Sequence, residues 1–329
     1  MAAGLTTAVA GFIGEVPPLE LTGDEGRALD VLTRRVTQTA PALVDDPGWL
    51  AQARTAGCHL PPRLLETLRA FRHDARSGVL LITNLPVALD PLPPTPSMPD
   101  SAEPAATVPA AIIVLLGQQL GEIVAYRDEK HGALVQNVVP VPELARTQSN
   151  GGSSPLELHT ENAFHPNRPD YVGLLCLRSA HEGVGTQVAS IRHALPLLAA
   201  GELEILRQPR FVTAAPPSFW SADRSQPRPV LTGAADDPDL CVDFHATAPQ
   251  DPEAAAALTR LREALLQVRV ELVLRPGALA FLDNRLVVHG RGGFAPRYDG
   301  GDRWLHRVFV HLDHRRSRAR RAGNGHVLV

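Results

Sequence analysis

Lysine is almost absent from this chain of 329 residues, which contains 31 arginines but only one lysine, Lys130. The 32 basic and 35 acidic residues nearly balance, and the formal net charge is −3. A dedicated nucleic-acid-binding protein usually carries a basic excess or a basic stripe, so this composition argues against a nucleic-acid partner. We interpret the arginine bias as the mark of GC-rich coding, with no partner attached to it.

Cysteine and long apolar runs are also scarce. The cysteines are too few and too scattered for a disulfide framework or a Cys-x-x-Cys zinc site; they are Cys58, Cys176 and Cys241. The N-terminus lacks a basic segment and carries Glu15 early, so we expect no signal peptide. The best candidate for a membrane span, 108–120, is short and interrupted at 117–119, which argues against membrane association. We therefore expect a cytoplasmic protein.

Hydrophobic residues make up 44% of the chain and charged residues 20%, which is enough for a sizeable core. Apolar periodicity and capping signals predict a mainly helical part over 1–125. Within it we expect a buried strand at 78–86 and a long proline-rich surface loop at 86–109. The expected helices cover 22–36, 63–71, 110–123 and, further along the chain, 252–268.

After residue 130 short apolar runs alternate with glycine and proline, which predicts strands. Those runs are 134–141, 171–179, 186–191, 210–214, 240–244, 270–276, 278–283 and 303–313. Many short strands favour a sandwich or barrel, with the N-terminal helices packed against one face. We predict an α+β, mainly β, single domain over 1–329, with a β core at 126–313. The basic tail at 314–329 begins with HRRSRARR (314–321), which is expected to be solvated and frayed, with an anion-binding arm as the alternative.

Two His-x-acid motifs occur, His159-Thr160-Glu161 and His311-Leu312-Asp313, about as many as chance gives among 13 histidines and 35 acidic residues. A 2-His-1-carboxylate iron site needs a second histidine as well. Only the polar tail follows His311, whereas His289 lies after a predicted buried strand downstream of His159. Side chains alternate along an extended segment, so His159 and Glu161 would point to one side. These three residues form a candidate metal set, although His289 alone could be a structural histidine.

Two arginines follow His289 in an apolar segment, RWLHRVFV. If this segment is a strand, Arg303 and Arg307 share one face. Buried guanidinium groups need anionic partners, and their fork geometry suits carboxylates. A surface position for both remains the alternative in so arginine-rich a chain.

Three long segments carry a resemblance to a known family. They are LELHTENAFHPNRPDYVGLLCLRS (156–179), TQVASIRHALPLL (186–198) and GALAFLDNRLVVHGRGGFAPRYDGGDRWLHRVFV (277–310). They resemble the clavaminate synthase-like Fe(II)/2-oxoglutarate-dependent oxygenases, nearest the β-hydroxylases of free L-asparagine or L-arginine. The resemblance covers about residues 115–313. It implies a double-stranded β-helix, or jelly roll, with N-terminal and inserted helices.

The resemblance also implies roles for individual residues. His159, Glu161 and His289 would bind Fe(II), leaving positions on the metal for 2-oxoglutarate and O2. Arg303 would bind the distal carboxylate of 2-oxoglutarate, with Thr186 as a second contact.

A free amino acid is the implied partner, and nothing in the sequence points to an obligate protein partner. Arg307 matches the family's arginine for the substrate α-carboxylate, and Glu129 lies where relatives place the acceptor for the α-amino group. Asn150 sits in SNGGSS, a stretch suited to a flexible lid. Glu129 as an exposed charge and Asn150 as an ordinary turn residue remain the alternatives.

Asp243 is the candidate reader of the substrate side chain. Relatives that act on arginine use two acidic residues two positions apart, and here the earlier position is Cys241. One carboxylate together with Asn150 suits a primary amide. We therefore expect hydroxylation of a free L-amino acid at C3, with L-asparagine converted to 3-hydroxyasparagine and release of succinate and CO2.

Other functions stay open at this point. Arginine, glutamine or a cyclic guanidino amino acid are alternative substrates. A jelly roll that keeps the constellation without catalysis and a zinc hydrolase are alternative classes. The zinc alternative leaves Arg303 and Arg307 unexplained and lacks an obvious general base.

Overall fold

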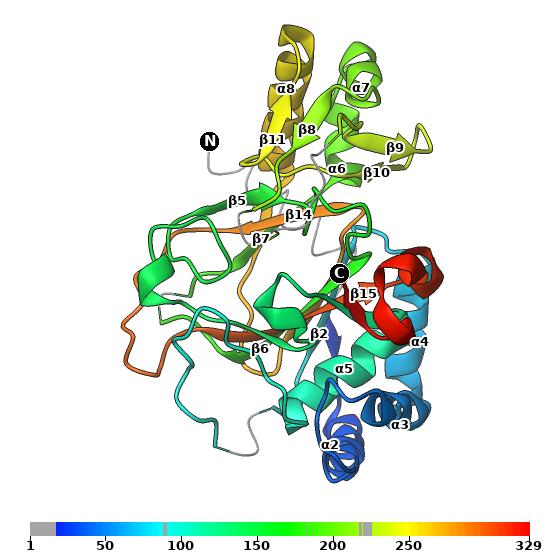
Figure 1. The fold of residues 1–329 in the computed structure, drawn as a ribbon, viewed down its shortest axis with the longest axis vertical. Coiled ribbons are helices and arrows are strands. Elements are labelled where there is room, and N and C mark those ends of the chain that lie inside the picture. The colour runs from blue at the N-terminus through cyan, green and yellow to red at the C-terminus, as the bar shows by residue number, and fades with distance from the viewer. Residues whose placement is uncertain (1–17, 88–90, 182, 217–218, 220–225) are drawn as a thin grey trace.

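The computed structural model describes residues 18–87, 91–181, 183–216, 219 and 226–329. Among them, an eight-stranded sheet runs in the order β1-β2-β13-β6-β15-β3-β16, with β4 paired to β15. A four-stranded sheet runs in the order β12-β7-β14-β5. Figure 1 shows the smaller sheet above the larger one in that view. This two-sheet core with added helices is the predicted α+β, mainly β fold.

The larger sheet contains β1 (Leu19–Glu20), β2 (Val79–Thr83), β3 (Glu122–Tyr126), β4 (Gln136–Val138), β6 (Tyr171–Arg178), β13 (Leu279–Asp283), β15 (Trp304–His311) and β16 (Val327–Leu328). The smaller sheet contains β5 (Leu156–His159), β7 (Thr186–Ser190), β12 (Val270–Leu272) and β14 (Val287–Arg291). Short turns between them include η1 (Lys130–Gly132) and η2 (Pro142–Leu144).

N-terminal helices cover the outer face of the larger sheet, as predicted (Figure 1). The helix α5 (Val108–Leu120) is apolar on nearly every side and packs on β15, β6 and β3. Three further helices pack on α5; they are α2 (Gly23–Thr37), α3 (Pro47–Gly57) and α4 (Pro62–His73). The predicted helix at 110–123 thus ends at Leu120 and is followed by β3. The helix α3 was not predicted, although Asp46 and Pro47 are a standard helix start.

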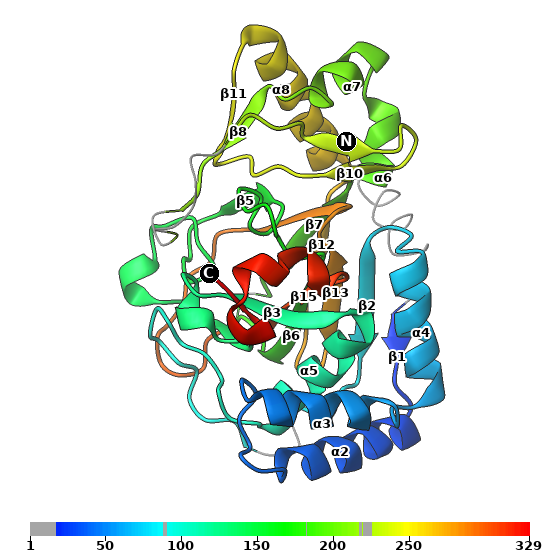
Figure 2. The same ribbon diagram turned by 45° about the vertical axis from the view of Figure 1, so that its right-hand side comes forward.

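A lobe of mixed structure is inserted between β7 and β12 (Figure 2). It contains α6 (Ile191–Ala194), η3 (Leu195–Leu197), α7 (Ala200–Leu206), β8 (Phe211–Thr213), β9 (Leu231–Gly233), β10 (Pro238–Leu240), β11 (Thr247–Pro249) and α8 (Pro252–Val268). The predicted helix at 252–268 is confirmed. The predicted strand at 240–244 is wrong beyond Leu240, because the Asp243 carboxylate accepts from the amides of His245 and Ala246 and closes a turn.

The prediction of a frayed C-terminal tail is wrong. The chain forms η4 (His314–Arg320) and η5 (Ala322–Asn324), after which β16 pairs in parallel with β3. Arg316 makes an ion pair of 2.8 Å with buried Asp170, and Arg321 is 2% exposed and donates to the carbonyl oxygen of His314 at 2.6 Å. Carboxylate and carbonyl partners therefore hold arginines that the composition alone places in solvent.

Strands from both predicted parts of the chain share the larger sheet, since β1, β2 and β3 pair directly or through neighbours with β13 and β15. This supports a single domain over 1–329, which stays a prediction. Within the described ranges, no helix is long and apolar enough to cross a membrane.

His306 on β15 should make folding sensitive to acid. It is fully buried, and neither ring nitrogen has a hydrogen-bond partner among the described residues. Burial lowers its pKa from 6.5 to about 3. Between these values the unfolded chain takes up a proton that the native protein does not, so the free energy of unfolding falls by about 1.4 kcal/mol per pH unit as the pH drops. His306→Phe should remove that contribution in urea unfolding measured above and below pH 6.5. If the free energy of unfolding of the variant depends on pH as that of the wild type does, His306 does not make the predicted contribution.

Candidate active site

A cavity of about 790 Å³ lies between the two sheets and the inserted lobe. Its wall contains residues of β5, β7 and β14 from the smaller sheet, of β6 and β15 from the larger sheet, and of the lobe. Every residue that was predicted to bind metal, cosubstrate or substrate lines this cavity: Glu129, Asn150, His159, Glu161, Thr186, Asp243, His289, Arg303 and Arg307. The fold therefore brings together residues that are up to 178 positions apart.

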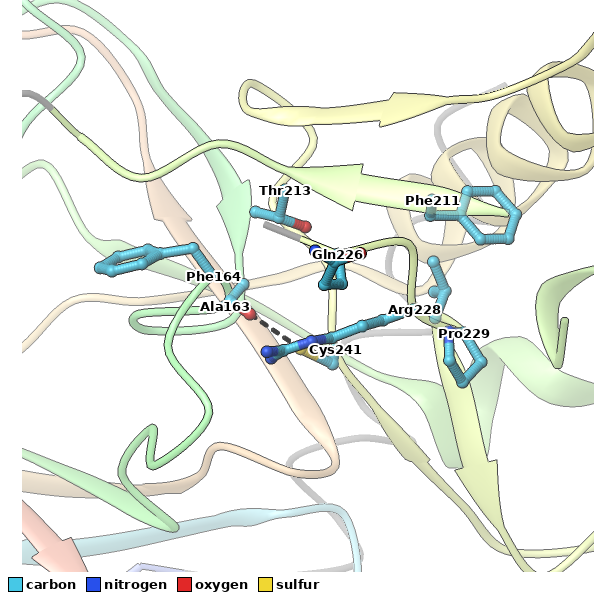
Figure 3. Close-up of a pocket in the computed structure, with 9 residues that line it drawn as sticks. Ala163, Phe164, Phe211, Thr213, Gln226, Arg228, Pro229 and Cys241 are labelled. Carbon is cyan, nitrogen blue, oxygen red and sulfur yellow. Dashed lines mark hydrogen bonds between the residues drawn. The ribbon is translucent and has the colours of Figure 1, made fainter. Parts of the chain in front are cut away.

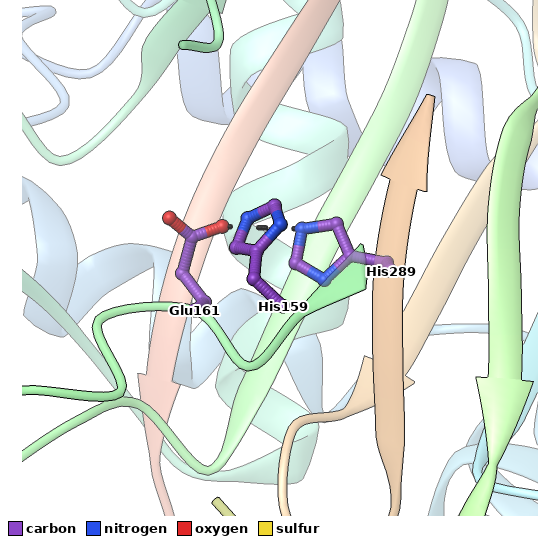
Figure 4. Close-up of side chains that lie close together, drawn as sticks. All are labelled: His159, Glu161 and His289. Carbon is purple, nitrogen blue, oxygen red and sulfur yellow. Dashed lines mark ion pairs between the residues drawn. The ribbon is translucent and has the colours of Figure 1, made fainter. Parts of the chain in front are cut away.

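The three side chains of the candidate metal set all line the cavity and lie close together (Figure 4). His159 ends β5 and faces His289 of β14 as its direct strand partner, and Glu161 follows two residues on. One ligand atom of each residue lies within 4.8 Å of the other two. The Nε2 atom of His289 lies 3.3 Å from Oε2 of Glu161. Two neighbouring strands and the turn that follows β5 thus bring three donors to a common centre.

These donors are in the chemical state that a divalent metal requires. The Nδ1 atom of His159 lies 2.9 Å from the carbonyl oxygen of Glu157, which favours the proton on Nδ1 and leaves Nε2 free. Burial and His159 lower the pKa of His289, so its ring is neutral. Burial opposes ionisation of Glu161, but Arg307 and His289 hold its pKa below the usual range. Its Oε2 has no hydrogen-bond partner among the described residues, and the neutral-imidazole and carboxylate donor set fits Fe(II).

Asn284 holds Glu161 in place and was missed in the sequence. Its side-chain oxygen accepts from the amide of Glu161 at 2.8 Å, and its side-chain nitrogen donates to the Glu161 carbonyl at 3.1 Å. The position of Asn284 directly after β13, five residues before His289, is the signal that could have found it.

Arg303 lies in the same cavity with no anionic partner among the described residues. It is 8% exposed, and its Nη2 lies 3.5 Å from the hydroxyl of Thr186. Burial lowers its pKa to about 10, which still leaves it charged at neutral pH. A buried cation beside a hydroxyl is suited to an anionic ligand.

Arg307 has several partners. It makes ion pairs with Glu129 and, at 3.0 Å, with Glu161, and its Nε donates to the Gln136 side chain at 3.1 Å. Gln136 on β4 was also missed in the sequence, since nothing in the motif shows that β4 pairs with β15. Glu129 in turn accepts from the side chain of Asn162 at 3.4 Å. A cation and a carboxylate therefore face each other beside the metal set.

The single lysine lies at the rim of this cavity. Lys130 is 8% exposed, and its ammonium donates to the carbonyl oxygens of Pro99, Ser101 and Asn137 at 3.0, 3.1 and 2.8 Å. Three converging acceptors suit the three donors of an ammonium better than the planar fork of arginine. Burial lowers the pKa of Lys130 to about 8. The residue ties the proline-rich loop to β4, directly beside Glu129.

Asp243 belongs to the inserted lobe and lines the cavity. Its backbone forms an isolated antiparallel β-bridge with that of His159. Its Oδ1 accepts from the backbone of the turn, and Oδ2 is the oxygen that remains for a ligand. A small cavity of about 20 Å³ adjoins this region and contains Cys241 and Phe164 (Figure 3). Cys241 donates to the carbonyl oxygen of Ala163 at 3.3 Å, and burial raises the pKa of its thiol. The position two residues before Asp243 is therefore neutral.

Comparison with known proteins agrees with this geometry. The family described as taurine catabolism dioxygenase TauD, TfdA family matches residues 47–309. The chain is 43% identical to an L-asparagine oxygenase of Streptomyces coelicolor over 97% of both chains. It is 37% identical to an L-lysine 3-hydroxylase of Catenulispora acidiphila, covering 94% of this chain and 88% of that protein.

A solved structure of asparagine oxygenase in complex with Fe(II), 2S,3S-3-hydroxyasparagine and succinate is also similar. The two structures superimpose with a TM-score of 0.92 at 43% identity, over 94% of this chain and 98% of the other. Fold, donor set and family agree on a jelly-roll enzyme. The chain belongs to the TauD/TfdA family and is an Fe(II)- and 2-oxoglutarate-dependent dioxygenase.

Proposed function

We propose that this protein hydroxylates free L-asparagine at C3, giving 3-hydroxyasparagine with release of succinate and CO2. The observation that carries the proposal is the ion pair of buried Arg307 and partly buried Glu129 beside the metal set. A zwitterionic amino acid offers the two opposite charges, so its carboxylate can pair with Arg307 and its ammonium with Glu129. The similar L-asparagine oxygenase, and the structure that holds 3-hydroxyasparagine, favour asparagine among the amino acids.

In this proposal His159, Glu161 and His289 hold Fe(II), and Arg303 with Thr186 binds the distal carboxylate of 2-oxoglutarate. Bound iron would supply the activation of O2 that is coupled to decarboxylation of the 2-oxo acid. The protein's contribution is to hold the reacting C–H bond in place and to exclude water. Glu161 and His289 are buried and His159 is partly buried in the wall of the cavity, which suits that task.

The part of the cavity wall that comes from the inserted lobe would read the substrate side chain. The free Oδ2 of Asp243 can accept from the amide NH2 of asparagine, and Asn150, which also lines the cavity, can donate to the amide carbonyl. Cys241 provides no second negative charge, since its buried thiol stays protonated. A single carboxylate matches a neutral amide better than a guanidinium group, for which the second acid is missing.

The test is a panel of free amino acids incubated with the full-length enzyme, Fe(II), 2-oxoglutarate and ascorbate. Gain of one oxygen atom is read by mass spectrometry, and succinate is measured in parallel. L-Asparagine should react best, ahead of arginine, lysine, glutamine and a cyclic guanidino amino acid. Arginine reacting faster by a wide margin would show that the interpretation of Cys241 and Asp243 is wrong. Failure of every amino acid to yield succinate would remove the proposal.

Asp243→Asn should weaken the use of asparagine and improve the relative use of aspartate. The substituted side chain keeps an oxygen for the turn amides and replaces the second oxygen with a donor, so the fold is retained while the recognition is inverted. Leaving a charge-assisted hydrogen bond unmade costs about 1.5–3 kcal/mol, and we expect kcat/KM for asparagine to fall about 10- to 100-fold. Unchanged selectivity between the two substrates would place Asp243 outside the recognition site.

The proposal requires a free amino acid and no protein partner. We infer a cytoplasmic location, because the three cysteines are free and the substrates are small metabolites of the cell interior. Two of these cysteines, Cys176 and Cys241, are not exposed.

A further inference from the structure

A third arginine, Arg291, lines the cavity together with Arg303 and Arg307. Arg291 lies two residues after His289 on β14, so the two side chains emerge on the same face of the strand. Its direct strand partner on β7 is Thr186, whose hydroxyl lies 3.5 Å from Arg303. Arg291 is 4% exposed and lines the same cavity as Arg303. Two buried arginines are thus neighbours of one threonine, Arg291 as its strand partner and Arg303 through a contact of 3.5 Å with its hydroxyl.

The charge of Arg291 is not matched by the protein. Its Nη2 donates to the carbonyl oxygen of Ser154 at 2.9 Å, its Nε donates to that of Gly292 at 3.2 Å, and the group lies over the ring of Phe294 at 4.8 Å. Among the described residues no carboxylate forms an ion pair with it. Burial and the positive charge of Arg303 lower its pKa to about 9. A neutral amide could make the same carbonyl contacts, so these contacts do not account for a buried cation.

We propose that Arg291 is a second cationic group for the distal carboxylate of 2-oxoglutarate, acting together with Arg303 and Thr186. A carboxylate between the two arginines relieves their repulsion and compensates both buried charges at once. The arrangement selects 2-oxo acids that carry a second carboxylate at this distance from the keto group. The inference rests on the proposed role of Arg303, and it does not depend on which amino acid is hydroxylated.

The test measures binding of the 2-oxo acid without any amino acid present. Full-length enzyme loaded with Fe(II) under anaerobic conditions is titrated by calorimetry with 2-oxoglutarate, and with 2-oxovalerate, which has the same carbon skeleton without the distal carboxylate. In Arg291→Met the dissociation constant for 2-oxoglutarate should rise about 10- to 100-fold, the value of one charge-assisted contact. Binding of 2-oxovalerate should change less than about 2-fold, since it makes no such contact. The dissociation constant of Arg291→Lys for 2-oxoglutarate should lie between those of the wild type and Arg291→Met.

Arg178 offers a matched control. It also donates to backbone carbonyls, those of Gly300 at 2.9 Å and Pro93 at 3.1 Å, and lies over the ring of Trp304 at 5.9 Å, but it does not line the cavity. Arg178→Met should bind both 2-oxo acids as the wild type does. Unchanged binding of 2-oxoglutarate by Arg291→Met, or an equal loss for both 2-oxo acids, would overturn the inference. Because no amino acid is present, neither result depends on whether asparagine is the substrate.

Discussion

The His289→Ala enzyme should fail to retain iron and should hydroxylate no amino acid. The substitution leaves two donors where three converge within 4.8 Å. Loss of a partner that merely orients a metal ligand costs about 10- to 100-fold in metal affinity, and loss of a ligand should exceed that. The measurement is the iron content of anaerobically loaded and desalted protein, with succinate formation read alongside it.

The second His-x-acid motif supplies the control for this experiment. His311 is buried, and its Nε2 lies 3.1 Å from the carbonyl oxygen of Asn167, away from the cavity. His311→Gln changes a buried histidine of the same motif type and should leave the iron content equal to that of the wild type. Iron retained by His289→Ala would overturn the assignment of the three ligands.

The pairing of His159 with His289 shows what sequence patterns can and cannot predict. Alternation along a strand indicates that His159 and Glu161 point the same way, and that Arg303 and Arg307 share a face. It says nothing about which strands are neighbours. The direct pairing of His289 with His159 follows from the order of the strands in the smaller sheet. The long motifs implied a jelly roll through resemblance, but not this pairing.

Residues that contact the site from other elements could not be predicted from the sequence for the same reason. Gln136 reaches Arg307 because β4 pairs with β15 over only three residues. The tail was mistaken for solvated chain because a run of arginines has the same composition whether it meets water or carbonyl groups. Only the fold places Asp170 opposite Arg316. Arg291 could have been predicted, since it shares its strand phase with His289, but nothing else in the sequence distinguishes it from the other arginines among the 31.

The near absence of lysine makes the position of the one lysine informative. In a chain that uses arginine almost everywhere, Lys130 stands where three carbonyl oxygens converge on one buried nitrogen. Arginine at this position would leave part of its planar fork without acceptors. The preference for arginine over lysine therefore reflects coding at most positions. Lysine is used at position 130, where the hydrogen-bond geometry requires a compact cation.

Arg307→Met should reduce kcat/KM for asparagine about 10²- to 10³-fold, because removal of one partner from a buried charge pair costs about 2–5 kcal/mol. The variant leaves Glu129 and Glu161 facing the cavity without their shared cation. Arg307→Lys keeps the charge but cannot reach both carboxylates and Gln136 as a fork, so its kcat/KM should be intermediate.

Steady-state kinetics with asparagine, and anaerobic binding of 2-oxoglutarate in the absence of asparagine, separate effects on the amino acid site from effects on the 2-oxoglutarate site. Binding of 2-oxoglutarate should stay within about 3-fold of wild type, since Arg303 is untouched. An equal loss in both measurements would mean that Arg307 supports the whole cavity and does not recognise the amino acid carboxylate.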